Sequence, residues 1–141
     1  MAISSNGTVW YVNWEARSTI RLLTSHKNSI TSIATFENLI ATGSNDNTMR
    51  LWTPEGEEIL QHQSTNHTCT AVEVYPAESC LAAGFSDGTV RFFHTRSLKY
   101  INKCKASQSS ITTMKFAGEV LLVSSDTGII SVVFFEKWEP L

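Results

Sequence analysis

The stretch Leu39-Ile-Ala-Thr-Gly-Ser-Asn-Asp-Asn-Thr-Met-Arg-Leu-Trp52 is the most regular part of the 141-residue chain. It consists of an apolar run, a polar turn, and then alternating apolar and polar residues that end in tryptophan. Two short runs of this kind on either side of a turn rich in Asn, Asp and Ser are typical of a β-hairpin. The stretch therefore predicts strands at 39–43 and 48–52.

The turn and second strand of this stretch return three times at a regular spacing. The repeats are Ser5-Asn-Gly-Thr-Val-Trp-Tyr-Val12, Ser86-Asp-Gly-Thr-Val-Arg-Phe-Phe93 and Ser125-Asp-Thr-Gly-Ile-Ile-Ser-Val-Val133. Equivalent positions, separated by 40, 41 and 40 residues, are Thr8, Thr48, Thr89 and Ile129. Such a period, with one turn-plus-strand pattern per unit, is typical of a β-propeller whose units are four-stranded blades.

This period divides the chain into four units within a single domain. Residues 1–24 are the end of a blade, 25–63 and 64–104 are full blades, and 105–141 are an incomplete last blade. Apolar and polar residues also predict strands at 8–12, 19–23, 30–36, 58–61, 71–75, 80–85, 89–93, 99–103, 111–116, 120–124 and 129–135. The predicted fold class is all-β, a partial propeller of about three and a half four-stranded antiparallel blades.

A propeller needs roughly four or more blades to close. We therefore expect that the chain is a fragment of a longer protein, or that another copy or a partner completes the ring.

The composition indicates which classes of binding partner and which cellular compartment to expect. Eleven basic and thirteen acidic residues leave a formal charge of −2, which predicts neither nucleic-acid nor membrane-surface binding. No apolar run is long enough to span a membrane, and the N-terminal residues do not resemble a secretory signal. The odd, widely spaced set of Cys69, Cys80 and Cys104 fits free thiols in a reducing compartment. We expect a cytoplasmic protein.

The units resemble the WD40 repeat, whose pattern is a Gly-His pair followed by Ser-x-Asp-x-Thr-Val-x-Leu-Trp-Asp. The unit 25–63 matches it at His26, Thr42, Ser44, Asp46, Thr48, Arg50, Leu51 and Trp52. It departs at Ser25 and Thr53, where Gly and Asp are usual. The next unit keeps 86–91 but has Phe93 for the tryptophan and a displaced His67, and the last keeps Asp126 and Gly128 with Val133 for the tryptophan.

This resemblance implies a non-catalytic scaffold that binds other proteins and holds a multiprotein assembly together, without a cofactor or a metal. It implies a structural hydrogen-bonded tetrad of His26, Thr42, Asp46 and Trp52. It places the blade turns at Asp87, Gly88, Asp126 and Gly128. The residues implied to face a partner lie where strands begin: Lys27, Asn28, Ser29, Thr68, Ser109 and Ser110. Units without a full tetrad are expected to be held more by packing.

Two further resemblances suggest other binding roles. The stretch 81–89 is similar to WD-repeat proteins of centrioles and cilia, which implies a structural component bound to microtubules. Acidic tubulin would favour a basic face, which the charge balance does not predict. Adaptors of cullin ubiquitin ligases carry Trp-Asp-x-Arg, whereas this chain has Trp52-Thr-Pro-Glu55 and Phe93-His-Thr-Arg96.

Catalysis and metal binding are the alternatives from other classes. His26 with Asp46 could serve as a base and its orienting carboxylate, with Ser44 as nucleophile, but the tetrad explains the same residues. A group of His62, His67 and Cys69 lacks the further ligands of a zinc site.

The remaining predictions concern packing. Because Arg50 and Arg91 alternate with apolar neighbours, their side chains are expected to point away from the packed face. Six aromatic residues are interpreted as packing between blades: Trp10, Phe92, Phe93, Phe134, Phe135 and Trp138. An incomplete last blade would nevertheless leave an apolar face exposed around 132–135 and Trp138.

Overall fold

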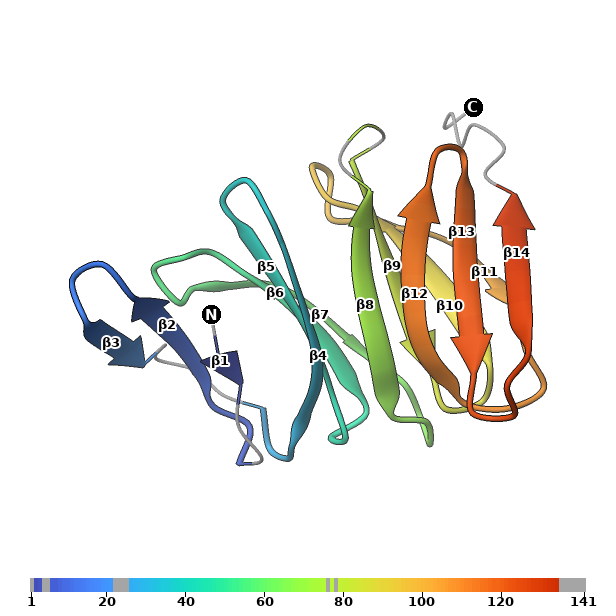
Figure 1. Ribbon diagram of the computed structural model, residues 1–141, viewed down its shortest axis with the longest axis horizontal. Coiled ribbons are helices and arrows are strands. Elements are labelled where there is room, and N and C mark those ends of the chain that lie inside the picture. Colours follow the sequence, from blue (N-terminus) through green and yellow to red (C-terminus); the bar gives the residue numbers. More distant parts are fainter. Residues whose placement is uncertain (1, 4–5, 22–25, 76, 78, 135–141) are drawn as a thin grey trace.

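The computed structural model describes residues 2–3, 6–21, 26–75, 77 and 79–134. Fourteen strands in this part form four antiparallel sheets, which confirms the all-β prediction. Figure 1 shows the sheets one after another in chain order, each turned relative to the one before, as in an open propeller. None of the described segments is a helix long and apolar enough to cross a membrane.

The strands of each sheet follow one another along the chain, so that neighbours are joined by hairpins. The first sheet contains β1 (Ala2–Ile3), β2 (Val9–Asn13) and β3 (Ser18–Arg21). The second contains β4 (Ile30–Phe36), β5 (Leu39–Ser44), β6 (Thr48–Trp52) and β7 (Glu58–Gln63). The third contains β8 (Cys69–Tyr75), β9 (Cys80–Phe85), β10 (Thr89–His94) and β11 (Tyr100–Lys105). The fourth contains β12 (Ile111–Ala117), β13 (Val120–Ser125) and β14 (Ile130–Phe134).

The predicted strands agree with the observed ones in order and, to within two residues, in their bounds. β4, β6 and β9 match residue for residue, whereas β8 begins two residues before the predicted start. Strand β1 was not predicted, because a two-residue strand carries too short an alternation to be recognised. Two parts of the predicted strands, residues 22–23 and the part beyond Phe134, lie outside the described residues, as do Phe135 and Trp138.

The three sheets that begin with a long inner strand share one irregularity of register. The pairing shifts between Ile30 and Ser32 in β4, and equivalent shifts occur near the start of β8 and β12. These shifts are β-bulges, which increase local twist and turn a strand away from its partner. Because the bulge recurs at the same place, Ser44, Phe85 and Ser125 are equivalent positions. Other equivalences below are counted from these three.

The core lies between neighbouring sheets. We call the face of a sheet that meets the preceding sheet its back and the face that meets the next sheet its front. Apolar side chains from the front of the second sheet, such as Met49 and Leu51, pack with Val72, Leu81 and Phe85 of the third. A similar layer joins the third and fourth sheets, and a smaller one joins the first and second. A sheet between two others is therefore buried on both faces.

The aromatic residues divide into two groups in this arrangement. Phe92 and Phe93 are buried between sheets, and Trp10 is half-buried. Phe134 does not pack between sheets: its side chain is exposed, which agrees with the apolar face expected around 132–135 in an incomplete last blade.

Candidate functional site: the polar network and the rim

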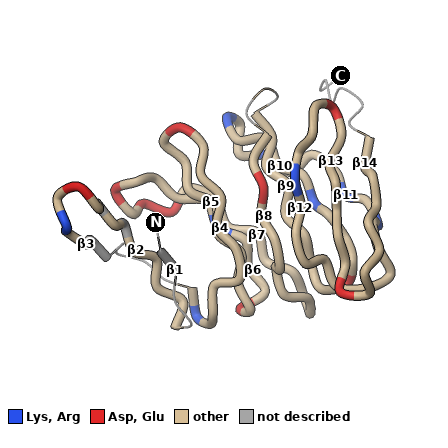
Figure 2. Tube along the Cα trace, in the orientation of Figure 1, with Lys and Arg blue, Asp and Glu red and all other residues tan. Residues whose placement is uncertain are grey.

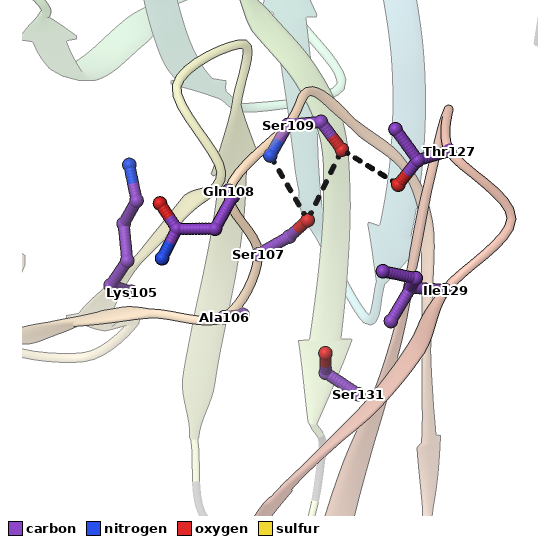
Figure 3. A pocket seen from close by; sticks show the side chains of 8 residues that line it. All are labelled: Lys105, Ala106, Ser107, Gln108, Ser109, Thr127, Ile129 and Ser131. Carbon is purple, nitrogen blue, oxygen red and sulfur yellow. Dashed lines mark hydrogen bonds between the residues drawn. The ribbon is translucent and has the colours of Figure 1, made fainter.

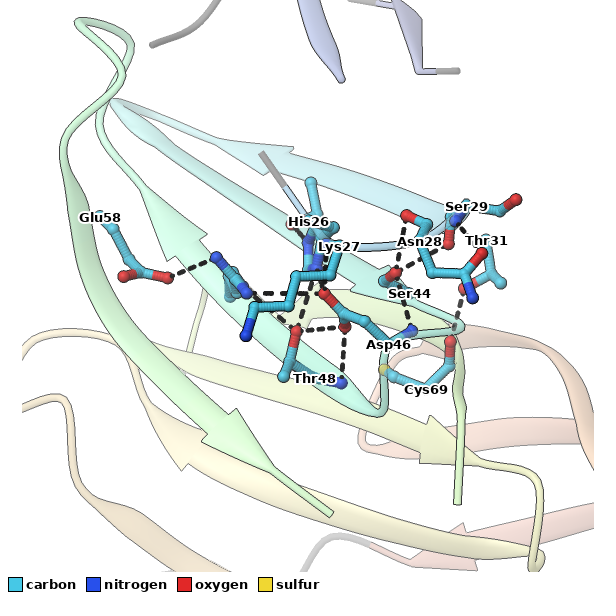
Figure 4. Close-up of polar contacts among 12 residues, drawn as sticks. His26, Lys27, Asn28, Ser29, Thr31, Ser44, Asp46, Thr48, Glu58 and Cys69 are labelled. Carbon is cyan, nitrogen blue, oxygen red and sulfur yellow. Dashed lines mark hydrogen bonds and ion pairs between the residues drawn. The ribbon is translucent and has the colours of Figure 1, made fainter. Parts of the chain in front are cut away.

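The polar network of the second sheet joins residues that are far apart in the sequence (Figure 4). The Nδ1 atom of His26, which precedes β4, lies 3.0 Å from a carboxylate oxygen of Asp46 in the β5–β6 turn. The Nε2 atom of His26 lies 2.6 Å from the hydroxyl of Thr42, on β5. The indole N–H of Trp52, on β6, donates to the same hydroxyl at 2.8 Å. The structure thus brings the four predicted tetrad residues together.

The donors and acceptors of this network determine the proton positions. An indole N–H can only donate, so the hydroxyl of Thr42 accepts from Trp52 and donates its own proton to His26 Nε2. The proton of the neutral ring is then on Nδ1, where it meets Asp46. Every member of the tetrad is satisfied, and His26 and Thr42 are buried.

Asp46 is the point at which the network meets the backbone. The amides of Lys27 and Thr48 both donate to its carboxylate at 2.9 Å, and the hydroxyl of Thr48 also donates. Burial alone would raise the pKa of Asp46, but these hydrogen bonds outweigh it and hold the pKa below its ordinary value. For His26, burial is the largest effect and lowers the pKa, against the opposing attraction of Asp46.

This geometry does not assemble a nucleophile and a base. The hydroxyl of Ser44 donates to the carbonyls of Asn28 and Ser29, and it accepts from the amide of Asp46. Both ring nitrogens of His26 are occupied by other partners. The network therefore holds loop 26–29 against the β5–β6 turn.

The third sheet keeps only part of the network. His67 lies 3.7 Å from Asp87, whose carboxylate also accepts from the amide of Thr89. Ala83 and Phe93 occupy the positions of Thr42 and Trp52, so no hydroxyl and indole can complete a tetrad. His67 is two residues closer to its inner strand than His26 is, which leaves it half-exposed.

The hydrogen bonds of the fourth sheet shift the motif position that the sequence assigned to Asp126 by one residue. The amides of Asn45, Ser86 and Asp126 donate to the carbonyls of Ser29, Thr68 and Ser110, respectively. Asp126 is therefore equivalent to Asn45 and Ser86, and Thr127 takes the position of Asp87. An alignment of the motif letters alone misses this shift, because unit four has Asp-Thr-Gly where unit three has Asp-Gly. The hydroxyls of Ser107, Ser109, Ser125 and Thr127 form a chain of short contacts there.

The expectation that Arg50 and Arg91 point away from the packed faces was wrong. Arg50 is 9% exposed and lies between Asp46 and Glu58, at 3.5 and 3.4 Å. Arg91 lies over the ring of Phe85 and donates to His62 Nε2 at 2.6 Å. Alternation predicts exposure only when one face of a sheet meets solvent, whereas neighbouring sheets cover both faces here.

Sequence reasoning missed the arginine–histidine cluster between the second and third sheets. His62, on β7, stacks with Tyr100 and lies close to Phe93, with ring centroids 6.3 and 5.1 Å apart. Burial, and then the charge of Arg91, lower the pKa of His62. Among the described residues no three His, Cys, Asp or Glu side chains gather as a metal would require, and Cys69 is fully buried.

The predicted partner-facing residues all lie along one edge of the sheets, at the lower edge in Figure 1. We call this edge the rim; it consists of the loops 26–29, 64–68 and 106–110 and the turns 45–47, 86–88 and 126–128. Lys27 and Asn28 are exposed, whereas Ser29, Thr68, Ser109 and Ser110 are half-buried. Figure 2 shows basic and acidic residues at many places along the Cα trace, in the sheets and in their loops.

A pocket of about 510 Å³ opens on the rim between the third and fourth sheets (Figure 3). Three small side chains, Ser107, Thr127 and Ser131, stand in the positions that His26, Asp46 and Arg50 occupy in the second sheet. The pocket therefore lies where larger polar side chains are replaced by small ones. Its other lining residues are Lys105, Ala106, Gln108, Ser109 and Ile129.

Comparison with known proteins agrees with this architecture. Residues 34–119 match the family model of the anaphase-promoting complex subunit 4 WD40 domain. The chain belongs to the WD40-repeat family. A curated relative, WD repeat-containing protein 90 of Xenopus tropicalis, is 30% identical over 139 residues. The mouse and human proteins of that name are 25% and 27% identical over 137 residues.

Each of these alignments covers 89% of this chain but only 7–8% of the relative. The WD40 chain thus spans less than a tenth of the length of the curated relatives that it matches. Among solved structures, the crystal structure of the computationally designed Ika4 protein superposes with a TM-score of 0.84. That match covers 95% of this chain and 83% of the designed one at 17% identity, so it bears on the fold alone.

Proposed function

We propose that this WD40 chain is a non-catalytic binding module that holds a multiprotein assembly together through its rim. Membership of the WD40 family implies a protein-interaction scaffold. The observation that supports the rim as the binding surface is its repeated construction. In each of three sheets, the amide of a turn residue donates to the carbonyl just before the inner strand, at 2.9 to 3.0 Å.

This construction uses the backbone and leaves side chains available. Lys27 illustrates the point, because its amide is held by Asp46 while its side chain is exposed. Loops fixed in this way lose little conformational freedom when a partner binds. The open pocket lined in part by Gln108 adds a concave position on the rim for a partner side chain.

The test is crosslinking in cells with tagged wild-type chain and two charge variants of the rim, Lys27→Glu and Gln108→Arg. The control is Glu119→Lys, an exposed position in the β12–β13 hairpin at the opposite edge of the sheet. The proposal expects a defined set of proteins to be crosslinked by wild type and the control and lost from the rim variants. A set that is unchanged by both rim variants would contradict the rim as the binding surface.

A further inference from the structure

The front of the fourth sheet is apolar and exposed. Its residues Leu122, Ile130 and Val132 are 36%, 70% and 49% exposed. No described segment packs on this face, and Figure 1 shows β12, β13 and β14 as the last sheet of the row. Exposed contiguous apolar surface of this kind commonly marks an interaction site.

In the second and third sheets, the equivalent face is covered by the sheet that follows. Counted from the equivalent positions, Ile130 corresponds to Met49 and Val90, which are both fully buried by the following sheet. Val132 corresponds in the same way to Leu51 and Phe92, which are each 1% exposed. The front of the fourth sheet therefore repeats the pattern of two fronts that are covered in this same molecule.

Backbone hydrogen bonds at the turns also indicate that the fourth sheet lacks a following neighbour. The carbonyl of Gly7 accepts from His26, that of Asn47 from Ser64, and that of Gly88 from Ala106. Each of these bonds joins the turn of one sheet to the loop that leads into the next. The equivalent residue of the fourth sheet, Gly128, has nothing within 4 Å of the position where a side chain would begin. Within the described residues, its turn has no following loop to contact.

The chain also carries the surface that would fit this face. Val12, on the back of the first sheet, is equivalent to Trp52 and Phe93, which are buried against the preceding sheet. Val12 itself is 39% exposed, and Trp10 beside it is half-exposed. Among the described residues, the fourth sheet thus presents an uncovered front and the first sheet an uncovered back.

We propose that a second copy of this chain docks with the back of its first sheet on the front of the fourth sheet. The contact is head to tail, because inside the chain every front meets a back and never another front. It continues the interface geometry already present three times between the four sheets. A heterologous contact of this kind closes into a ring if the rotation allows it and otherwise extends as a chain.

The experiment uses light scattering during size-exclusion chromatography over a series of chain concentrations. Wild type is expected to show a mass that rises with concentration to two copies or more. Ile130→Asp places a charge in the apolar front of the fourth sheet, and Val12→Asp places one in the back of the first sheet. Each variant alone is therefore expected to remain a monomer. Circular dichroism and a urea titration of each monomer establish that it is folded.

Mixing the two variants distinguishes the orientation. The copy with an intact front still fits the copy with an intact back, so an equimolar mixture is expected to form a dimer and nothing larger. Val132→Lys, mixed with Val12→Asp, repeats this arm with an independent change of the front. Glu119→Lys, outside both faces, is expected to associate as wild type does.

Three outcomes would overturn the proposal. Wild-type chain that stays monomeric at every concentration shows that a second copy does not dock on this face. Association that survives Ile130→Asp and Val132→Lys places the contact elsewhere. Association that is lost in Ile130→Asp but unaffected by Val12→Asp indicates a front-to-front dimer.

Discussion

Thr42 is the residue on which the buried network depends, because its single hydroxyl serves both His26 and Trp52. Replacing it by valine preserves the volume but leaves a buried indole N–H and a buried ring nitrogen without their partner. A buried polar group without its hydrogen bond costs about 1–3 kcal/mol. The role of the network can therefore be measured at this one atom.

We predict that Thr42→Val lowers the free energy of unfolding by roughly 2 kcal/mol, as an unsatisfied buried polar group should. The measurement is the urea midpoint, with Thr113→Val on the exposed side of β12 as the matched control. Because Thr113 shares a face with Ile130, both variants are measured at a concentration at which the chain is monomeric. Surface changes of that kind usually stay within about 0.5 kcal/mol. Equal costs for the two valine variants would show that the network contributes no stability.

Substitutions at Gly88 and Gly128 distinguish the cost of a left-handed backbone conformation from the cost of a clash with a neighbouring loop. Both have φ of +81°, but a side chain at Gly88 would clash with the backbone carbonyl of Ser107. Gly128 has nothing within 4 Å. We expect Gly128→Ala to cost about 1–2 kcal/mol for the left-handed conformation alone. Gly88→Ala should cost clearly more, because the loop that begins the fourth sheet must move.

The two alanine variants are compared in thermal or urea unfolding of the otherwise identical chain. A cost for Gly88→Ala no larger than that for Gly128→Ala would mean that the contact with Ser107 gives way without strain. The comparison should be made at a concentration at which the chain is monomeric, so that association does not stabilise either variant.

At the scale of elements, the contact between the second and third sheets depends on an uncharged histidine. Arg91 can only donate, so His62 Nε2 must accept and cannot carry a proton while the bond exists. Burial and Arg91 keep the pKa of His62 below 6.5 in the folded chain. As the pH falls below 6.5, the unfolded chain therefore binds more protons at this residue than the folded chain does.

We accordingly predict that the free energy of unfolding decreases as the pH is lowered from 6.5 toward the folded pKa of His62. Urea unfolding at a series of pH values measures the slope. His62→Gln should make the slope shallower but not zero, because His26 is buried and also has a lowered pKa. An identical slope in the variant would exclude His62 as a contributor.

A separate loss of stability is expected at lower pH. The carboxyls of Asp46 and Asp87 both have pKa values held below 3.8, because hydrogen bonds to the charged form outweigh their burial. A depressed carboxyl pKa stabilises the fold above 3.8, and the contribution is lost as the pH falls through the folded value. In urea unfolding over this pH range, Asp46→Asn should reduce this second loss. It should also steepen the loss that begins at 6.5, because the Asp46 charge opposes the lowering of the His26 pKa.

At the scale of the whole molecule, the described residues cover the two inner sheets on both faces and the outer sheets on one. Stability in such arrays is close to a sum of units and the interfaces between neighbours. Under dilute conditions, we predict that amide hydrogen exchange is slowest in β5–β6 and β9–β10 and faster in β13–β14. Mass spectrometry of peptides after exchange measures this. Uniform protection over all four sheets would indicate that the chain unfolds as a single unit.

Most of the secondary structure could be predicted from the sequence alone. A hairpin forms where apolar runs flank a turn, and that pattern is local, so nearly every strand was predicted near its observed bounds. The repeat then determined the order of the strands, because each unit is one sheet. The residues of the tetrad were predicted through the resemblance to the WD40 repeat, because one unit of the chain keeps all four motif positions.

The tertiary structure decided what lies against each sheet. Whether Arg50 is exposed depends on the neighbouring sheet that covers it, and no alternation along β6 records that neighbour. The pairing of His62 with Arg91, 29 residues apart on different sheets, likewise depends on how two sheets pack. The same holds for the apolar front at Ile130, because exposure is a relation between a side chain and its surroundings. Local pattern therefore determines the sheets, whereas packing between sheets determines which of their surfaces remain free to bind.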